Sequence, residues 1–153
     1  MSEFKPFDDK LAALIASLSP ASRHKMAAEI AKQLRASQQQ RIKRQQAPNG
    51  TPYASRKRQP VRGKQGRVKR AMFAKLRTHR YMKAKGSIDD AVVEFVGRVQ
   101  RMARVHQDGL KDRPTRYSKE VRYDVRELLG FSEADRKIVE DAVISVMATS
   151  CDD

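Results

Sequence analysis

Apolar residues at both ends of the chain recur three or four positions apart, which is the spacing of one face of an α-helix. Near the N-terminus this set is Phe7, Leu11, Leu14, Ile15 and Leu18. Near the C-terminus it is Ile138, Val139, Ala142, Val143, Val146 and Met147. Ser132 and Asp135 resemble a capping box, so we expect a closing helix that starts there and runs to about residue 148.

A second N-terminal helix is expected from Pro20 to about Gln46, because Ser19 suits the N-cap and proline suits the first helical position. Its apolar stripe consists of Met26, Ala27, Ile30, Ala31 and Leu34. Beyond Leu34 the sequence RASQQQRIKRQQ contains only Ile42 as a large apolar residue. We therefore expect the end of this helix to project from the domain or to pack on another subunit.

The middle of the chain alternates between turns and short apolar stretches. Two prolines and Asn49-Gly50 end the long helix in a turn. Residues 53–67 are rich in Arg and Lys, which favours a loop that is mobile in the free protein. The spacing of Val68, Met72, Phe73 and Leu76 is typical of a short helix or strand.

Further on, the turn at Gly86-Ser87 and the β-rich run 91–96 predict a hairpin. Spaced apolar residues from Val99 to His106 predict a short helix ended by Gly109. Val121, Tyr123 and Val125 alternate with charged residues, as in a half-buried strand.

The whole pattern predicts an α+β protein with N-terminal helices, a long protruding helix, a small antiparallel sheet and a C-terminal helix. A length of 153 residues favours a single domain over residues 1–153, with 47–67 as a basic loop or arm.

Charge changes this picture, because it is unevenly spread. The chain has 33 Lys and Arg against 18 Asp and Glu, a formal net charge of +15. No acidic residue occurs from Ile30 to Ile88, and this span holds 18 basic residues. Its densest part is Arg41, Lys43, Arg44, Arg56, Lys57, Arg58, Arg62, Lys64, Arg67, Lys69 and Arg70. An acidic partner is therefore expected.

Three interpretations of the basic span remain open at this point. Its side chains can contact nucleic-acid phosphates with a strong dependence on salt. They can dock on an acidic protein surface and speed assembly by electrostatic attraction. They can also form a solvated loop whose charge keeps the protein in solution. No zinc finger or RNA-recognition signature points to the reading of a base sequence.

Patterns of catalysis and metal binding are missing from the sequence. The three histidines lie far apart, and no nucleophile–base constellation, P-loop or metal-ligand pair is visible. Cys151 stands beside two aspartates, which disfavours a nucleophilic thiol. We therefore expect neither an enzyme nor a cofactor or metal. Without a signal-peptide pattern or a membrane-spanning apolar run, we expect a soluble protein of the cytoplasm.

Three segments of the chain resemble the phage virion morphogenesis family, the tail-completion proteins of contractile-tailed temperate phages. Residues 34–60, LRASQQQRIKRQQAPNGTPYASRKRQP, resemble its Gln-rich helix and P-[DN]-G-T-P-[YW] turn. Residues 103–109, ARVHQDG, are similar to its A-x-x-H-Q-x-G segment, although Asp108 replaces the aromatic residue often found there. Residues 125–132, VRELLGFS, are similar to its A-R-x-[FL]-L-G-[FL]-S segment.

The resemblance implies a virion assembly protein and not an enzyme. Such a protein finishes the head-proximal end of the tail so that it can join the head. It implies a ring of copies, often six, with the tail tube, tail terminator, neck proteins or channel DNA as partners and no membrane. Assembly in the host cytoplasm would place it at the head–tail junction. The alternatives are a sequence-independent nucleic-acid-binding protein that uses the basic 32–85 stretch, or an assembly chaperone absent from the finished virion.

Five residues are candidates for a subunit interface: Ile42, Tyr53, His106, Gln107 and Arg126. His106 and Gln107 can supply hydrogen bonds between subunits. Alternatively, His106 ends a short helix and bonds a carbonyl, while Gly109 takes a left-handed turn. Arg126 is a charge within an apolar segment, so it must find a partner or solvent.

Overall fold

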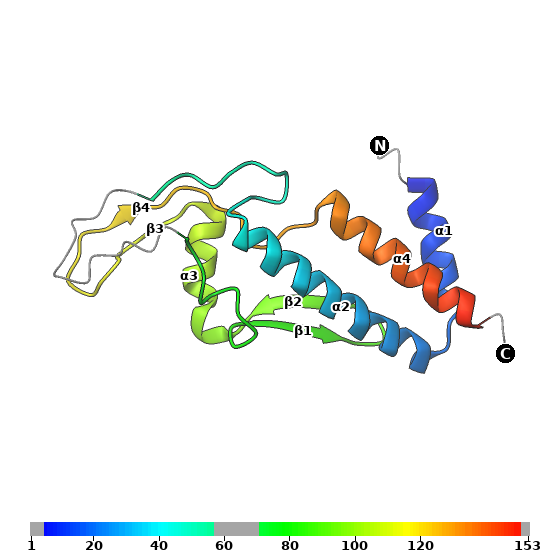
Figure 1. Cartoon of the computed structure of the whole chain (residues 1–153). Helices are drawn as coiled ribbons and strands as arrows, with labels where there is room; N and C mark the ends of the chain where they lie inside the picture. Colours follow the sequence, from blue (N-terminus) through cyan, green and yellow to red (C-terminus); the bar gives the residue numbers. More distant parts are fainter. Residues whose placement is uncertain (1–4, 57–70, 151–153) are drawn as a thin grey trace. The chain divides into compact units, whose positions relative to one another are not determined.

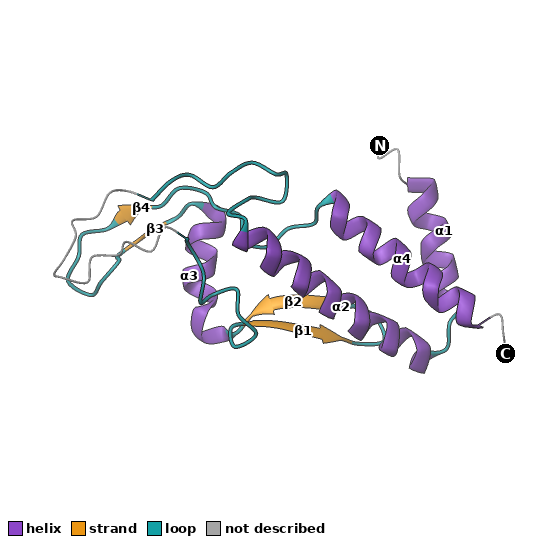
Figure 2. Cartoon of the chain, viewed as in Figure 1, coloured by secondary structure: helices purple, strands orange, loops and turns teal. Residues whose placement is uncertain are grey.

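The computed structural model describes residues 5–56 and 71–150, and it is a mixture of helices and short strands (Figures 1 and 2). The elements are α1 (Lys5–Ala16), α2 (Pro20–Lys43), β1 (Met82–Gly86), β2 (Ala91–Phe95), α3 (Gly97–Asp108), β3 (Lys111–Asp112), β4 (Val121–Arg122) and α4 (Glu133–Ser150). β1 pairs with β2 and β3 pairs with β4 in two separate two-stranded sheets. The predicted α+β class, with a small antiparallel sheet and a C-terminal helix, is confirmed.

The chain divides into two compact units. Unit 1 comprises Met1–Ala36, Ala84–Glu94 and Glu133–Asp153, and unit 2 comprises Ser37–Lys83 and Phe95–Ser132. Both α2 and the β1–β2 hairpin therefore contribute residues to each unit. The single domain over residues 1–153 stays a prediction.

The core of unit 1 is built by α1, the first part of α2, and α4 (Figure 1). Its buried members are Leu18, Met26, Ile30, Ala142 and Val143. Partly buried residues packed against them are Leu11, Ile15, Leu34, Ala91, Val139, Val146 and Met147. The helical faces predicted at the two ends of the chain thus meet in one core, although Leu14 is exposed. The side chain of Phe7 lies outside the described part of the structure.

Polar contacts fix the helices of unit 1. The N–H of Ser22 donates to Ser19 Oγ over 3.2 Å, which confirms Ser19 as the N-cap of α2. Arg136 of α4 donates to Asp8 Oδ1 of α1 over 2.7 Å and to Glu140 Oε1 over 3.1 Å. One guanidinium therefore ties α1 to α4.

The hairpin predicted from the sequence is present, and its tip packs in unit 1. Ser87 Oγ donates to Asp90 Oδ1 over 2.7 Å, and the N–H of Asp90 donates to Ser87 Oγ over 3.0 Å, so the turn is closed by its own side chains. Next to this turn, Gly86 lies against the backbone of Ala27 and Ala28 in α2. A glycine is required there because a Cβ would overlap the α2 backbone.

In unit 2, α3 ends as predicted. Gly109 has φ 66° and its N–H bonds to Val105 O, the left-handed C-terminal turn that glycine favours. Val99, Ala103 and Val105 are the buried residues of this helix, whereas Met102, expected on the buried face, is exposed.

Two short elements differ from the prediction. β4 ends at Arg122, and Val125 is 60% exposed, so the expected strand over 121–125 is wrong beyond its second residue. Beyond Arg122, at Arg126, the backbone bonds to α3 and not to another strand, since the N–H of Arg126 donates to His106 O over 2.8 Å. The expected helix or strand at Met72–Leu76 is also wrong, because residues 71–80 form consecutive turns. Val68 lies outside the described residues.

The end of α2 does not project from unit 2. Gln38 and Arg41 are each 4% exposed, and Ile42 is completely buried. The sequence suggested projection because the apolar stripe ends at Leu34. Instead, Gln38 and Arg41 continue the buried face of α2, because their side chains form hydrogen bonds with residues far away in the sequence.

Candidate assembly site

The three segments that resemble the family meet within unit 2 (Figure 1). They are the end of α2 with the turn after it, the end of α3, and residues 125–132, which belong to the irregular stretch 123–132. Side chains of each segment bond to the backbone of another, as the following contacts show.

Gln38 and Arg41 hold the stretch 128–130 against the end of α2. Arg41 Nη2 donates to Gln38 Oε1 over 2.6 Å and to the carbonyl of Leu128 over 2.9 Å. Gln38 Oε1 also accepts the N–H of Gly130 over 3.1 Å. Hydrogen bonds to these oxygens offset part of the cost of burying the Arg41 charge.

Gln107 holds the same stretch from α3. Its Oε1 accepts the N–H groups of Leu128 and Leu129 over 2.8 and 3.0 Å. Its Nε2 donates to the carbonyl of Leu129 over 2.7 Å. The side-chain amide of Gln107 therefore both accepts from and donates to this backbone, as a peptide group of a neighbouring β-strand would.

The turn after α2 is closed by local bonds. The N–H of Ala47 donates to Thr51 O over 2.8 Å, and the N–H of Thr51 donates to Asn49 Oδ1 over 3.0 Å. This confirms that Asn49-Gly50 acts through turn chemistry. Pro48 lies against Gly130, so the turn packs on the stretch 123–132.

Tyr53 and Arg126 connect the chain after this turn to the same stretch. Tyr53 is buried, and its hydroxyl donates to Glu127 O over 2.6 Å. Burial raises the pKa of Tyr53 to about 12, against a lowering effect of Arg41 and with a further raising effect of Glu127. Arg126 Nε donates to Ala54 O over 2.9 Å.

Arg126 also donates through Nη2 to Ser55 O over 3.3 Å and lies 3.6 Å from Asp124 Oδ2. Its side chain is only 7% exposed. The partner that the sequence argument demanded for this charge therefore lies within unit 2.

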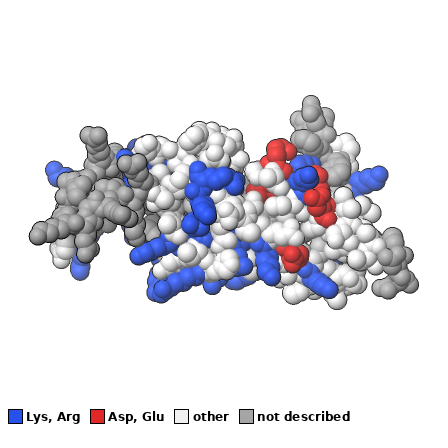
Figure 3. Space-filling view, viewed as in Figure 1, with Lys and Arg blue, Asp and Glu red and all other residues white. Residues whose placement is uncertain are grey.

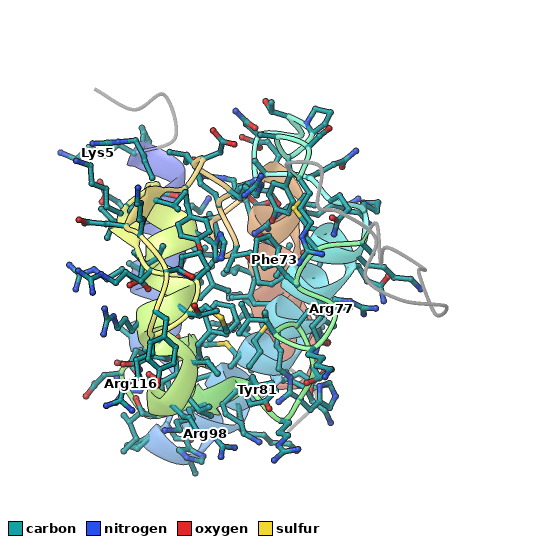
Figure 4. All side chains as sticks on the ribbon, turned by 90° about the vertical axis from the view of Figure 1, so that its left-hand side faces the viewer. Lys5, Phe73, Arg77, Tyr81, Arg98 and Arg116 are labelled. Atoms are coloured by element: carbon teal, nitrogen blue, oxygen red, sulfur yellow. The ribbon has the colours of Figure 1, made fainter. Side chains whose placement is uncertain are left out.

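Four rings form a row beside these bonds. Tyr53 and Phe73 have ring centroids 5.8 Å apart, and Phe73 and Tyr123 each lie 4.9 Å from His106, all edge to face. Phe73, labelled in Figure 4, is half-buried. Phe73 has a φ of 65°, a strained value for an aromatic residue, so the surrounding packing imposes it.

His106 sits in this row as a neutral ring. Its Nδ1 is buried and has no hydrogen-bond partner among the described residues. Burial lowers the pKa of His106, and the charges of Arg126 and Arg56 lower it further. His106 lies in the last turn of α3, as interpreted from the sequence. The expected bond from its side chain to a carbonyl is not formed by Nδ1 within the described part of the chain; the main-chain carbonyl of His106 instead accepts the N–H of Arg126 over 2.8 Å.

The predicted site residues thus divide by exposure. Arg41, Ile42, Tyr53 and Arg126 are buried in unit 2, and His106 and Gln107 are half-buried. Lys43, Arg44 and Arg56 are exposed. Lys57, Arg58, Arg62, Lys64, Arg67, Lys69 and Arg70 lie outside the described residues. The docking and interface roles stay predictions.

Sequence reasoning missed Gln38 and Gln45. Gln45 donates to Met72 O over 2.9 Å and accepts the N–H of Met72 over 2.8 Å, so it fixes the first of the turns at 71–80. The available signal was the spacing of Gln38, Arg41 and Gln45, which repeats every three or four residues like an apolar stripe.

Within residues 5–56 and 71–150, no three His, Cys, Asp or Glu side chains are grouped to hold a metal ion. In the same ranges, no helix has both the length and the apolar character needed to cross a membrane.

Comparison with known proteins identifies the family of this chain. Residues 2–148 match the phage virion morphogenesis family, and the chain belongs to that family. The chain is also 47% identical to the Tail completion protein S of Escherichia phage P2 over 146 residues. This matched region covers 95% of this chain and 97% of that protein. No solved structure matches the chain.

Proposed function

We propose that this protein completes the tail during phage virion assembly and that it does so as a structural component, not as an enzyme. The observation that carries the proposal is the 47% identity to a tail completion protein, which extends over 97% of that relative. Membership in a virion morphogenesis family supports the same role.

In finer detail, the protein acts at the head-proximal end of the tail as a ring of identical copies. It assembles in the host cytoplasm and resides at the head–tail junction, where the tail tube, the tail terminator or neck proteins are its partners. Unit 2 supports this role physically. Its buried bonds fix one backbone arrangement, and the exposed side chains of Lys43 and Arg44 can dock on an acidic partner.

Complementation of an assembly lysate tests the role. A phage lysate that lacks only its tail completion protein should accumulate separate heads and tails. Addition of the purified protein from the matching phage should restore joined particles in electron micrographs. If the protein is folded by circular dichroism and joins none, tail completion is excluded.

A matched pair of variants tests the docking residues. The double variant Lys43→Glu, Arg44→Glu should lower the yield of joined particles. The control Lys25→Glu, Lys137→Glu makes the same charge change at exposed positions of unit 1 and should keep the yield. Equal losses would remove the docking role from Lys43 and Arg44.

The ring and its location need separate measurements. Light scattering coupled to size exclusion gives the mass, and a ring of six 17.4 kDa copies would give about 104 kDa. A monomer at all concentrations, alone and with tails, would exclude the ring. Immunoblotting of purified virions separates a structural component, which is retained, from an assembly chaperone, which is absent.

A further inference from the structure

A second basic surface lies outside the 32–85 stretch. It is an open groove of about 630 Å³ between α3 and the chain that follows it. The groove is lined by Arg98, Arg101, Met102, Lys111, Asp112, Arg113, Thr115, Arg116 and Glu120. Figure 4 shows Arg98 and Arg116 close together on the side of unit 2 that faces the viewer.

Internal bonds join residues that line the groove. Arg101 Nη2 donates to Asp112 Oδ1 over 3.0 Å and thereby joins α3 to β3. The same carboxylate accepts the N–H of Arg113 over 2.9 Å. Lys111 and Asp112 pair with Arg122 and Val121 of β4. Arg98, Lys111, Arg113 and Arg116 are all exposed, so their charges face solvent.

The other charged residues of unit 2 are also mostly basic, like those of the groove. Among the described residues, unit 2 has 17 basic and 5 acidic residues, whereas unit 1 has 9 basic and 10 acidic residues. On the face in Figure 3, acidic side chains gather over α4 of unit 1. The described part of unit 2 therefore carries a net positive charge, which favours an acidic partner at the groove.

We propose that this groove binds the phosphate backbone of duplex DNA without regard to base sequence. Four of its five cations are arginines, whose planar guanidinium groups bind phosphate oxygens in pairs. DNA interfaces are polar and strongly positive, whereas the cores of protein interfaces are apolar and aromatic. Met102 is the one apolar residue of the nine that line the groove, which favours DNA over an acidic protein.

Binding of the purified full chain to a fluorescent duplex of mixed sequence tests this, measured by anisotropy over a range of NaCl concentrations. The test variant is Arg98→Ala, Arg113→Ala, Arg116→Ala, which leaves the Arg101–Asp112 pair in place. The control variant, Lys10→Ala, Lys25→Ala, Lys137→Ala, removes the same charge from exposed positions of unit 1. Residues 57–70 are unchanged in all three proteins.

The groove variant should lose on the order of a hundredfold in affinity near physiological salt, and its log–log salt slope should fall by about 3. The control should lose much less. Equal losses in both variants would overturn the proposal. Replacement of the three arginines by lysine preserves charge and should preserve most of the slope, which separates lost contacts from lost folding.

A polyglutamate chain serves as the probe for an acidic protein partner. If the groove variant loses polyglutamate binding as strongly as DNA binding, the duplex is the wrong ligand and the proposal fails. The measurements use only purified protein and probe, so they are independent of the outcome of tail complementation.

Discussion

Gln107 bonds Leu129 in both directions. The side-chain amide of Gln107 accepts the N–H of Leu129 over 3.0 Å and donates to its carbonyl over 2.7 Å. This reciprocal pair joins two of the three family-like segments. It gives Gln107 a role inside the unit, whatever it does between subunits.

Replacing Gln107 with alanine should destabilise the protein by about 2–4 kcal/mol, because three part-buried backbone groups lose their partner. Urea unfolding followed by circular dichroism measures the change. Gln40→Ala is the matched control, since Gln40 is an exposed glutamine on a helix, and it should change stability by less than about 0.5 kcal/mol. A Gln107→Ala protein as stable as this control would contradict the structural role.

Tyr53→Phe should cost about 1 kcal/mol, because it removes the hydrogen bond to Glu127 O and keeps the ring. The exposed Tyr117, at 92%, gives the control Tyr117→Phe, which should have no measurable effect.

Alkaline pH tests the same hydroxyl. Burial raises the pKa of Tyr53 from 10.0 to about 12, so the unfolded chain loses this proton first as pH rises. The contribution of Tyr53 to stability is therefore full below pH 10.0 and is lost as pH rises toward about 12. Unfolding midpoints across this range should fall less steeply in Tyr53→Phe. Parallel curves for the two proteins would contradict the burial effect.

Acid pH tests His106. Its pKa is lowered from 6.5 mainly by burial, so the unfolded chain takes up a proton first as pH falls. The stability from the neutral ring is therefore full above pH 6.5 and is lost as pH falls through the lowered pKa. His106→Phe keeps a ring between Phe73 and Tyr123 and should weaken this dependence, whereas the exposed His24→Gln should leave it unchanged. If stability falls equally steeply with pH in the wild type, His106→Phe and His24→Gln, the burial effect on His106 is contradicted.

Gly86→Ala should destabilise the protein by more than about 2 kcal/mol, because the new methyl group overlaps the backbone of Ala28 in α2. Gly97→Ala is the control: a Cβ there meets nothing within 4 Å. At the start of α3 alanine should be neutral or slightly stabilising. Thermal unfolding of both variants decides, and similar melting temperatures would show that the hairpin adjusts freely.

The sequence predicted the helices and the hairpin because apolar periodicity and turn residues are local signals. It failed at residues 71–80, where Met72 and Leu76 are buried without regular structure. The backbone of Met72 is bonded by the side chain of Gln45, 27 positions earlier in the chain. Spacing along one segment carries no information about such a contact.

The candidate site shows the same limit. The family-like motifs indicated segments that meet in unit 2, and Arg126, expected to find either a partner or solvent, is bonded within the unit. Asp124 is a neighbour in the sequence, but the hydrogen-bond partners Ala54 and Ser55 lie more than 70 positions away in the chain. Gln38 and Gly130 are separated by 92 positions. A pairing over such distances is set by the tertiary fold, which one sequence does not display.

The stretch 123–132 contains no helix or strand, yet its peptide groups are bonded as if it did. The N–H groups of Arg126, Leu128, Leu129 and Gly130 donate to His106, Gln107 and Gln38. Their amide protons should therefore exchange with deuterium as slowly as those of the helices. In hydrogen-exchange measurements this irregular segment should open together with α3. Although it has no regular secondary structure, it would then unfold in the same cooperative unit as the helix.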